Sequence, residues 1–524
     1  MKRQIKPAFF KKQGFIMKMR KIIVAMLALV LVLSSLLTLV ACGDKDNGKD
    51  KAIIYVTALF AGGLYDKESG EAKWEPFKTE VDVDAFLRGE LSFEDVLATF
   101  PEKEISDTLV MILKALTYSE NTLLWDLTLD NDGVGYNKNI VPANDLPKDA
   151  NDSVMDISYG VFGIYKSFVT NLQAEFGNDY DVFVYNQDWR ISPAVSAQRL
   201  EEYINSKGYK EVVFMSHSMG APVVNSYLAR SEENRNKVKL YTGFAPATLG
   251  SFDALAALAC PDVYVNNFLE GVDLSSLPVD VNTIVKDVVG GKLGDFFRNN
   301  IGLMSLVPSW QLIDSDQYGD GESGITVDGK PIESKEELYD LYKGMRWAKY
   351  LVPRTQEEIM EAEEGDEERL YNRIVATSGQ YADEDGYRLK DAAATLDKYF
   401  DSLFIDGKIA SEQVNSYYFL GGGKTNTITA MNLTTVRDEN GEPVRDEYGC
   451  IQYEYELVTG YGNEKCGDGT VPYYSSIGGN AATAEFIQSL GNRIVTFDGK
   501  DHGTVGMSWD LLGSYVIDLI KALG

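Results

Sequence analysis

The sequence predicts an α/β protein, a mostly parallel sheet with flanking helices and a large, mainly helical cap insertion. From residue 165 to residue 244, short runs rich in apolar and β-branched residues alternate with stretches of helical length, a pattern typical of parallel sheets. Between residues 261 and 414 this alternation lapses and helical patterns dominate. A chain of 524 residues exceeds one ordinary domain, so a core that carries an insertion is the expected organisation.

The predicted core begins with a buried strand at residues 52–56, an apolar run that ends in the glycine-bearing loop 57–63. After an insertion at about 81–152, the pattern predicts helices at 165–176, 193–207 and 221–230 and strands at 181–185, 212–215 and 239–244. Later come strands at 416–420 and 493–497, a hairpin turn at 438–441 and a C-terminal helix. The expected units are a core first part (52–260), a cap or lid (261–414) and a core second part (415–524).

The first residues predict an export segment rather than part of the fold. Residues 17–21 are positively charged, residues 22–41 carry no charge, and Cys42 follows a small residue. This pattern resembles a bacterial lipobox, in which the cysteine is lipidated and becomes the mature N-terminus. An uncleaved anchor is the alternative, because about 20 apolar residues could span a bilayer. We expect a signal peptide at 1–41, a tether at 42–51, and an extracytoplasmic lipoprotein held at the cell membrane through Cys42.

The charge of the chain disfavours nucleic acid as a partner. The net charge is −29, and loss of the export segment with its eight basic residues would take it to −37. Binding to phosphates needs clustered cations, so no nucleic acid partner is expected, and the lipid rather than charge would hold the protein at a membrane.

Beyond Cys42 the chain has Cys260, Cys450 and Cys466, of which the last two could pair in an exported protein. No Cys/His cluster indicates a metal site, and no cofactor is expected.

The strongest functional signal is a serine between a strand and a helix. The motif Ser216-x-Ser218-x-Gly220 departs from G-x-S-x-G at its first position, where serine is still a small residue. Such a nucleophile elbow exposes the serine at the top of an α/β-hydrolase sheet. It also places the Met219 N–H beside the nucleophile, as half of an oxyanion hole at a helix N-terminus. The alternative is a serine-rich turn with no chemical role.

A serine nucleophile needs a base, and the chain contains only two histidines. His217 is adjacent to Ser218 and is expected to point away across the turn, which leaves His502. The acid should lie between nucleophile and base in the chain, which favours Asp468 in a glycine-flanked loop. A simple Asp-Gly turn is the alternative there. Asp501 is a poorer candidate, because neighbouring side chains rarely face each other.

Two further groups of residues are candidates for the site. The second oxyanion donor should come from the loop 57–63, with the Leu59 N–H preferred and Phe60 next. The apolar stretch 297–313, which includes Met304 and Trp310, is a candidate lid or acyl-binding segment, together with Phe60. Its alternative is the packed core of the cap.

Several segments together resemble the lecithin:cholesterol acyltransferase family. They are the Asp-Trp-Arg of residues 188–190, the elbow 216–220, the Pro-Ala-Thr-Leu-Gly-Ser of 246–251, the acid loop 467–472 and the segment 66–74. The resemblance covers residues 53 to about 252 and 416 to 505. One departure is the first loop, where Thr57-Ala58 stands in place of the family's Pro-Gly.

The resemblance implies an α/β-hydrolase core with a cap, a Ser218–Asp468–His502 triad, and acyl transfer on lipid esters. Water or an alcohol would resolve the acyl-enzyme. Two other functions stay open: an esterase acting on non-lipid esters, and a catalytically silent envelope-binding lipoprotein, which the altered first loop favours.

Overall fold

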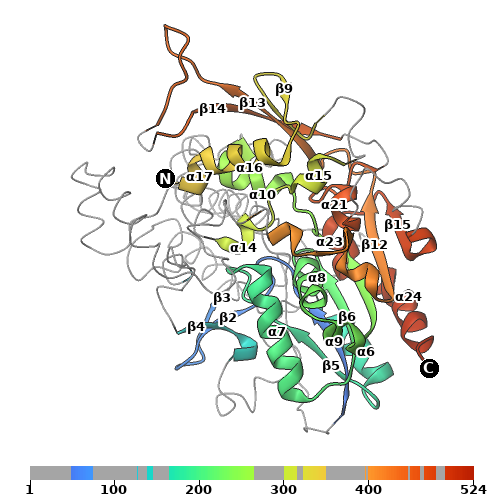
Figure 1. Ribbon diagram of the computed structural model, residues 1–524. Helices are drawn as coiled ribbons and strands as arrows, with labels where there is room; N and C mark the ends of the chain where they lie inside the picture. Colours follow the sequence, from blue (N-terminus) through green and yellow to red (C-terminus); the bar gives the residue numbers. More distant parts are fainter. Residues whose placement is uncertain are drawn as a thin grey trace, which may run out of the picture.

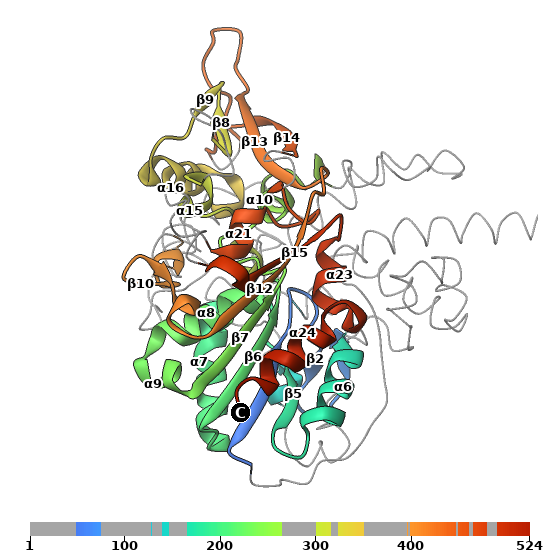
Figure 2. The same cartoon turned by 90° about the vertical axis from the view of Figure 1, so that its right-hand side faces the viewer.

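The centre of the protein is a six-stranded, fully parallel sheet. The computed structural model describes residues 49–74, 127, 139–145, 165–261, 263–264, 300–315, 323–349, 396, 399–446, 449–460, 465–478 and 490–524. The strand order is β15-β12-β7-β6-β1-β5. The strands are β1 (Lys51–Val56), β5 (Asp181–Tyr185), β6 (Glu211–His217), β7 (Val238–Phe244), β12 (Ser416–Gly422) and β15 (Ile494–Asp498). This sheet, with helices on both faces (Figures 1 and 2), confirms the predicted fold class.

Both faces of the sheet are buried, as the alternation of side chains along β1 illustrates. Ala52, Ile54 and Val56 pack into one apolar core. Ile53 and Tyr55 point to the opposite face and pack into a second one. Because neither face meets water, the strand reads as a continuous apolar run instead of alternating with polar residues.

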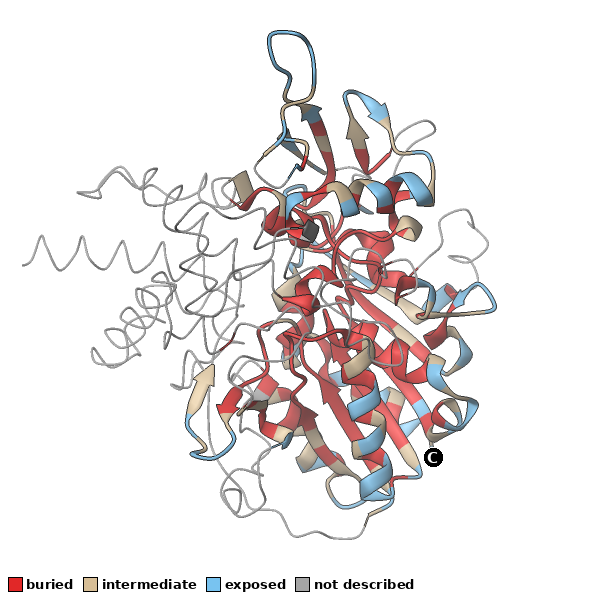
Figure 3. Ribbon diagram, turned by 60° about the vertical axis from the view of Figure 1, so that its left-hand side comes forward, coloured by how far each residue is buried: buried red, intermediate tan, exposed pale blue. Residues whose placement is uncertain are grey.

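Two sets of helices cover the two faces, on opposite sides of the sheet in Figure 2. One set contains α7 (Pro193–Lys207), α8 (Gly220–Arg230) and α9 (Glu232–Lys237), and the other contains α6 (Lys166–Phe176) and α24 (Trp509–Lys521). The shorter helices near the carboxyl ends of the strands are α10 (Phe252–Ala259), α21 (Tyr473–Ile477) and α23 (His502–Met507). The 3-10 turns Ala410–Gln413 and Gly491–Arg493 precede β12 and β15 at the opposite, amino ends of the strands. Figure 3 shows buried residues filling the sheet and exposed residues on the outer helix faces.

The described part of the cap contains strands as well as helices. Its helices are α14 (Ile301–Met304), α15 (Trp310–Ile313), α16 (Lys335–Gly344) and α17 (Arg346–Lys349). Its strands β8 (Ile325–Val327) and β9 (Lys330–Pro331) join β13 (Ile428–Thr435) and β14 (Tyr453–Thr459) in a four-stranded sheet of order β14-β13-β8-β9. Residues 261–414 are therefore continuous in structure with part of the predicted core second part. The sequence pattern does not predict this sheet.

Smaller elements complete the described fold. A three-stranded sheet consists of β2 (Leu64–Asp66), β3 (Ala72–Trp74) and β4 (Ile140–Pro142), followed by the 3-10 turn Ala143–Asp145. A two-stranded ribbon consists of β10 (Phe404–Ile405) and β11 (Lys408–Ile409). The turn expected at 438–441 is present, with the Gly441 N–H donating to the Asp438 carbonyl over 3.0 Å.

The export segment, Cys42 and most of the predicted insertion 81–152 lie outside the described residues. Among the helices that the structure describes, none has the length and apolar character that crossing a bilayer requires. Cys450 and Cys466 are buried and are thiols, not halves of a disulfide.

Candidate active site

Ser218 occupies a strained turn at the carboxyl end of β6. Its φ of 53° lies in the left-handed region, which non-glycine residues rarely adopt, and α8 begins two residues later. Gly220 permits this turn, because a Cβ there would collide with the Val56 carbonyl oxygen and lie 3.1 Å from that of Thr57. The elbow is therefore packed directly against the end of β1, where the loop 57–63 begins.

Asp468 and His502, 34 residues apart in the chain, form a hydrogen-bonded pair. The ring Nδ1 lies 2.8 Å from Asp468 Oδ2. The other carboxylate oxygen accepts the N–H groups of Thr470 and Val471 at 3.0 and 2.7 Å. Asp468 is 1% exposed, so these bonds stand in for water. Because the Nδ1 proton is directed at the carboxylate, the ring Nε2 is left with a lone pair that can accept a proton.

The close approach of the acid and base loops depends on Gly421 at the end of β12. A Cβ at this position would collide with the Lys500 carbonyl oxygen and lie 2.7 Å from Asp468 Cβ. The main-chain N–H of His502 also donates to the Asp468 carbonyl over 2.9 Å. The rejected acid candidate, Asp501, instead caps α23 through a 2.8 Å bond from the Thr504 N–H.

His217, the other histidine, lies against His502 with 4.9 Å between ring centroids. Its Nδ1 is 2.8 Å from the Tyr165 hydroxyl and its Nε2 is 3.3 Å from the His502 carbonyl oxygen, so both nitrogens are engaged. Burial and then the neighbouring His502 ring lower the pKa of His217 well below its usual range. This contact brings the backbone of His502 beside the residue that precedes Ser218. Within the described residues, the Ser218 hydroxyl makes no hydrogen bond to His502.

The loop that follows β1 presents main-chain N–H groups beside the elbow. The loop and the elbow leave the same sheet edge, because Val56 pairs with Ser216. Phe60 has a φ of 60°, a second strained non-glycine residue in the site. Neither the Leu59 N–H nor the Met219 N–H has an acceptor among the described residues. Two such groups are what an oxyanion hole requires.

Side chains of the Gln187–Trp189 segment hold this loop in place. Gln187 Nε2 donates to the Thr57 carbonyl over 2.5 Å, and Trp189 Nε1 donates to that of Gly62 over 3.0 Å. The Trp189 ring packs edge-on against Phe60, with 4.6 Å between centroids. Gln187 and Trp189 thus support the loop 57–63.

Asp188 and Arg190 form a buried pair that anchors this support. Arg190 Nε and Nη2 donate to the two Asp188 oxygens at 2.9 and 2.8 Å, and Nη2 also reaches the Ile140 carbonyl at 3.1 Å. Burial raises the pKa of Asp188, but the Arg190 guanidinium outweighs it and leaves the pKa below its ordinary value. The carboxylate is therefore ionised, and its charge is neutralised in place.

The candidate lid residues lie in or against the packed core. Phe60 is 3% exposed and Met304, in α14, is 2% exposed, whereas Trp310 at the start of α15 is half-buried. The Gly302 N–H of α14 donates to the Arg190 carbonyl over 3.0 Å, which joins the cap to the segment that supports the loop 57–63.

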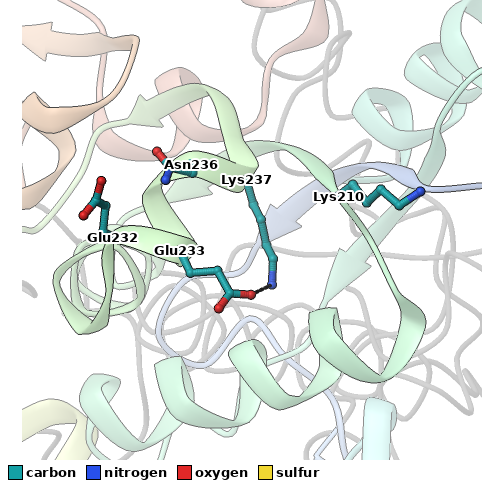
Figure 4. A pocket seen from close by; sticks show the side chains of 5 residues that line it. All are labelled: Lys210, Glu232, Glu233, Asn236 and Lys237. Carbon is teal, nitrogen blue, oxygen red and sulfur yellow. Dashed lines mark ion pairs between the residues drawn. The ribbon is translucent and has the colours of Figure 1, made fainter.

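A hollow that the described residues line lies at the other end of the sheet (Figure 4). Its lining consists of Lys210, Glu232, Glu233, Asn236 and Lys237. Lys210 precedes β6 and Ser218 follows it, so the seven-residue strand, about 23 Å long, separates them. Lys237 pairs with Glu233 at 3.0 Å. In the part of the chain that the structure describes, no three His, Cys, Asp or Glu side chains gather as metal ligands would.

Sequence reasoning did not single out Tyr165 and Gly421. Tyr165 is fully buried and 52 residues from His217, and Gly421 matters through the backbone that passes it. Neither has a local sequence signal. Because the chain has only two histidines, sequence draws attention to His217. The residues next to it in the chain do not indicate that it bonds to Tyr165 and to the His502 carbonyl.

Comparison with known proteins places this site in a familiar context. Residues 153–275 match the profile of the family described as lecithin:cholesterol acyltransferase, a range that contains Ser218 but neither Asp468 nor His502. The fold is similar to that of a chain in the crystal structure of the Tle4–Tli4 complex. The TM-score is 0.50 and the identity 13%, over 91% of this chain and 100% of that chain. At this identity the likeness concerns the fold. No curated protein sequence matches the chain.

Proposed function

We propose that the protein is a serine acyl hydrolase or O-acyltransferase that acts on lipid esters through an acyl-enzyme. The observation that carries this proposal is the 2.8 Å bond between Asp468 and His502, formed beside a serine held at a φ of 53°. The elbow and the candidate acid and base come from three distant parts of the chain. A purely structural role explains neither the strained serine nor the Leu59 and Met219 N–H groups, which have no acceptor among the described residues.

The reaction would begin with attack of Ser218 Oγ on the ester carbonyl. His502 Nε2 takes the serine proton as the C–O bond forms, and Asp468 stabilises the resulting imidazolium. The Met219 and Leu59 N–H groups hold the oxyanion, each worth a factor on the order of 100 to 1000 in rate. Collapse of the intermediate breaks the ester bond, and the departing alcohol takes the proton from His502. Water or a second alcohol then releases the acyl group by the reverse sequence.

The lipid part of this proposal has separate support. The family profile that matches residues 153–275 is named for a lipid acyltransferase, and the segment contains the candidate nucleophile. Ser-Asp-His triads occur in hydrolases of many kinds of ester. The class of ester must therefore be determined from rates with different substrates, because the triad residues do not indicate it.

A fluorophosphonate probe tests the chemistry. We expect it to label the purified protein at one site and the Ser218→Ala variant not at all, with Ser216→Ala as the matched control that keeps labelling. A folded protein that stays inert would support the catalytically silent alternative. Rates with esters of increasing acyl length then test the substrate class, because a preference for short chains would contradict a lipid substrate and favour the non-lipid esterase.

We further propose that Cys42 is lipidated and holds the protein at the cell membrane outside the cytoplasm. The support is the sequence pattern alone, since residues 1–48 lie outside the described residues. Metabolic labelling with an alkyne fatty acid should mark the expressed chain. Replacing Cys42 with alanine should abolish the label and release the protein from membranes, and retention of either would contradict the proposal.

A further inference from the structure

A buried chain of hydrogen bonds runs from the loop 57–63, here called the oxyanion loop, to the segment that carries His502. The Ala58 N–H donates to the Tyr165 hydroxyl over 3.3 Å. That hydroxyl lies 2.8 Å from His217 Nδ1, and His217 Nε2 lies 3.3 Å from the His502 carbonyl oxygen. Tyr165 is 0% exposed and His217 is 3% exposed, so water does not compete for these groups.

The chemistry of the two ends fixes every proton in this chain. A carbonyl oxygen only accepts, so His217 must carry its proton on Nε2 to bond to His502. Nδ1 is then an acceptor and receives the Tyr165 O–H, whose oxygen in turn accepts the Ala58 N–H. Burial raises the pKa of Tyr165, which keeps that proton on the phenol. All the bonds therefore point one way, from the oxyanion loop toward the base.

We propose that His217 and Tyr165 are positioning residues that hold the oxyanion loop and the His502 main chain at a fixed separation around Ser218. His217 is bonded covalently to Ser218, so the brace, meaning the Tyr165–His217 pair, is tied to the nucleophile as well. The inference rests on the proposed acyl-transfer function and extends it to two residues that do not contact the substrate. Misplacement of reacting groups by about 1 Å can cost on the order of 100-fold in rate.

The packing around the brace restricts its movement. A Cβ on Gly506, in the helix that His502 begins, would collide with three atoms of the His217 ring. The Tyr55 hydroxyl donates to the Gly506 carbonyl over 2.6 Å, and its ring lies 4.7 Å from that of Tyr165. The backbone of α23 at Gly506 thus packs directly against the His217 imidazole.

Kinetics of three variants test the positioning role. We expect Tyr165→Phe and His217→Leu to slow fluorophosphonate labelling and kcat by about 10- to 100-fold while KM stays within about threefold, because the groups act on geometry and not on binding. His217→Gln should recover much of the loss, since its amide N–H can still donate to the His502 carbonyl. Thermal melting of each variant shows whether it is folded. Equal rates for wild type, Tyr165→Phe and His217→Leu would overturn the proposal.

Histidine ¹⁵N NMR of the wild-type protein gives a readout that does not depend on activity. The chain contains only two histidines, and the structure assigns them opposite tautomers, Nδ1–H for His502 and Nε2–H for His217. A His217 ring that is protonated at Nδ1 near pH 7 would refute the brace. A wild type that the probe does not label contradicts the proposed function, whereas a labelled wild type with unaffected variants contradicts only this inference.

Discussion

The two sides of the candidate site are held by different means. On the acid–base side, the Asp468 carboxylate is bonded by the N–H groups of Thr470 and Val471, in its own loop, and by the His502 ring. The main-chain N–H of His502 returns to the Asp468 carbonyl. The hydrogen bonds of this side therefore join two short stretches of sequence, which approach each other over Gly421.

The oxyanion side depends on distant side chains. The partners of its main-chain groups, with their separations along the chain, are Gln187 for Thr57 (130 residues), Trp189 for Gly62 (127) and Tyr165 for Ala58 (107). The loop 57–63 supplies the N–H groups, but hydrogen bonds from side chains elsewhere in the chain fix their orientation. We therefore expect substitutions within the two loops to disrupt the acid–base side, and substitutions far along the chain to disrupt the oxyanion side.

The largest effect is expected on the base side, from Asp468→Asn. The amide cannot both keep its bonds to the loop N–H groups and accept from His502 Nδ1 as the carboxylate does, so the ring loses its tautomer. By analogy with other triads, kcat should fall by about 10⁴-fold while the protein stays folded. Asp501→Asn is the matched control, because asparagine also caps a helix, and its kcat should stay near wild type. A loss of less than tenfold in Asp468→Asn would contradict the assignment of the acid.

The second prediction tests whether close backbone packing encodes the base side. In Gly421→Ala the new methyl group would meet the Lys500 carbonyl and Asp468 Cβ, so the acid and base loops must separate. We expect a loss of about 3 kcal/mol in the free energy of unfolding, measured in urea, together with a lower kcat. Gly344→Ala at the end of α16, where a Cβ meets nothing within 4 Å, should change neither. Wild-type stability in Gly421→Ala would show that these loops can yield.

The third prediction tests the remote support of the oxyanion loop. Gln187→Met keeps the length of the side chain but removes the donor to the Thr57 carbonyl. The loop should relax, and kcat should fall by about tenfold, a fraction of what losing one oxyanion donor costs. Gln198→Met, on the exposed face of α7, is the control and should leave kcat unchanged. If kcat in Gln187→Met equals that of wild type, the loop is held without this bond.

Much of the fold, and the pairing of Asp468 with His502, could be predicted from sequence for the same physical reason. A buried strand and a glycine-flanked acid loop each have a sequence pattern that is contained within a few residues. The strands predicted at 181–185 and 239–244 accordingly match β5 and β7 closely. Elimination among two histidines then pointed to His502, which the structure pairs with Asp468.

The remainder was not predictable because its information lies far along the chain. The pairing of β8 with β13 joins residues about a hundred positions apart, and β14, with intermediate and exposed residues alternating, carries a weak pattern. Likewise, nothing near Ala58 indicates that Tyr165 receives its N–H. Only tertiary packing creates these contacts.

The smallest effect concerns His217, which touches both sides. Its pKa is lowered well below that of the unfolded chain, about 6.5, by burial and then by His502; the titratable groups that face it are Tyr165 and His502. As pH falls below about 6.5, this histidine becomes protonated in the unfolded chain but stays neutral in the folded protein. The contribution of His217 to the free energy of unfolding is therefore complete above this pH and is lost below it. Urea unfolding should show about 1 kcal/mol less stability at pH 5.5 than at pH 7.5 from this group. His217→Gln should lose that part of the slope, whereas His502→Gln should keep it. Identical slopes in wild type and His217→Gln would mean that the ring titrates freely, and that it does not brace the two sides.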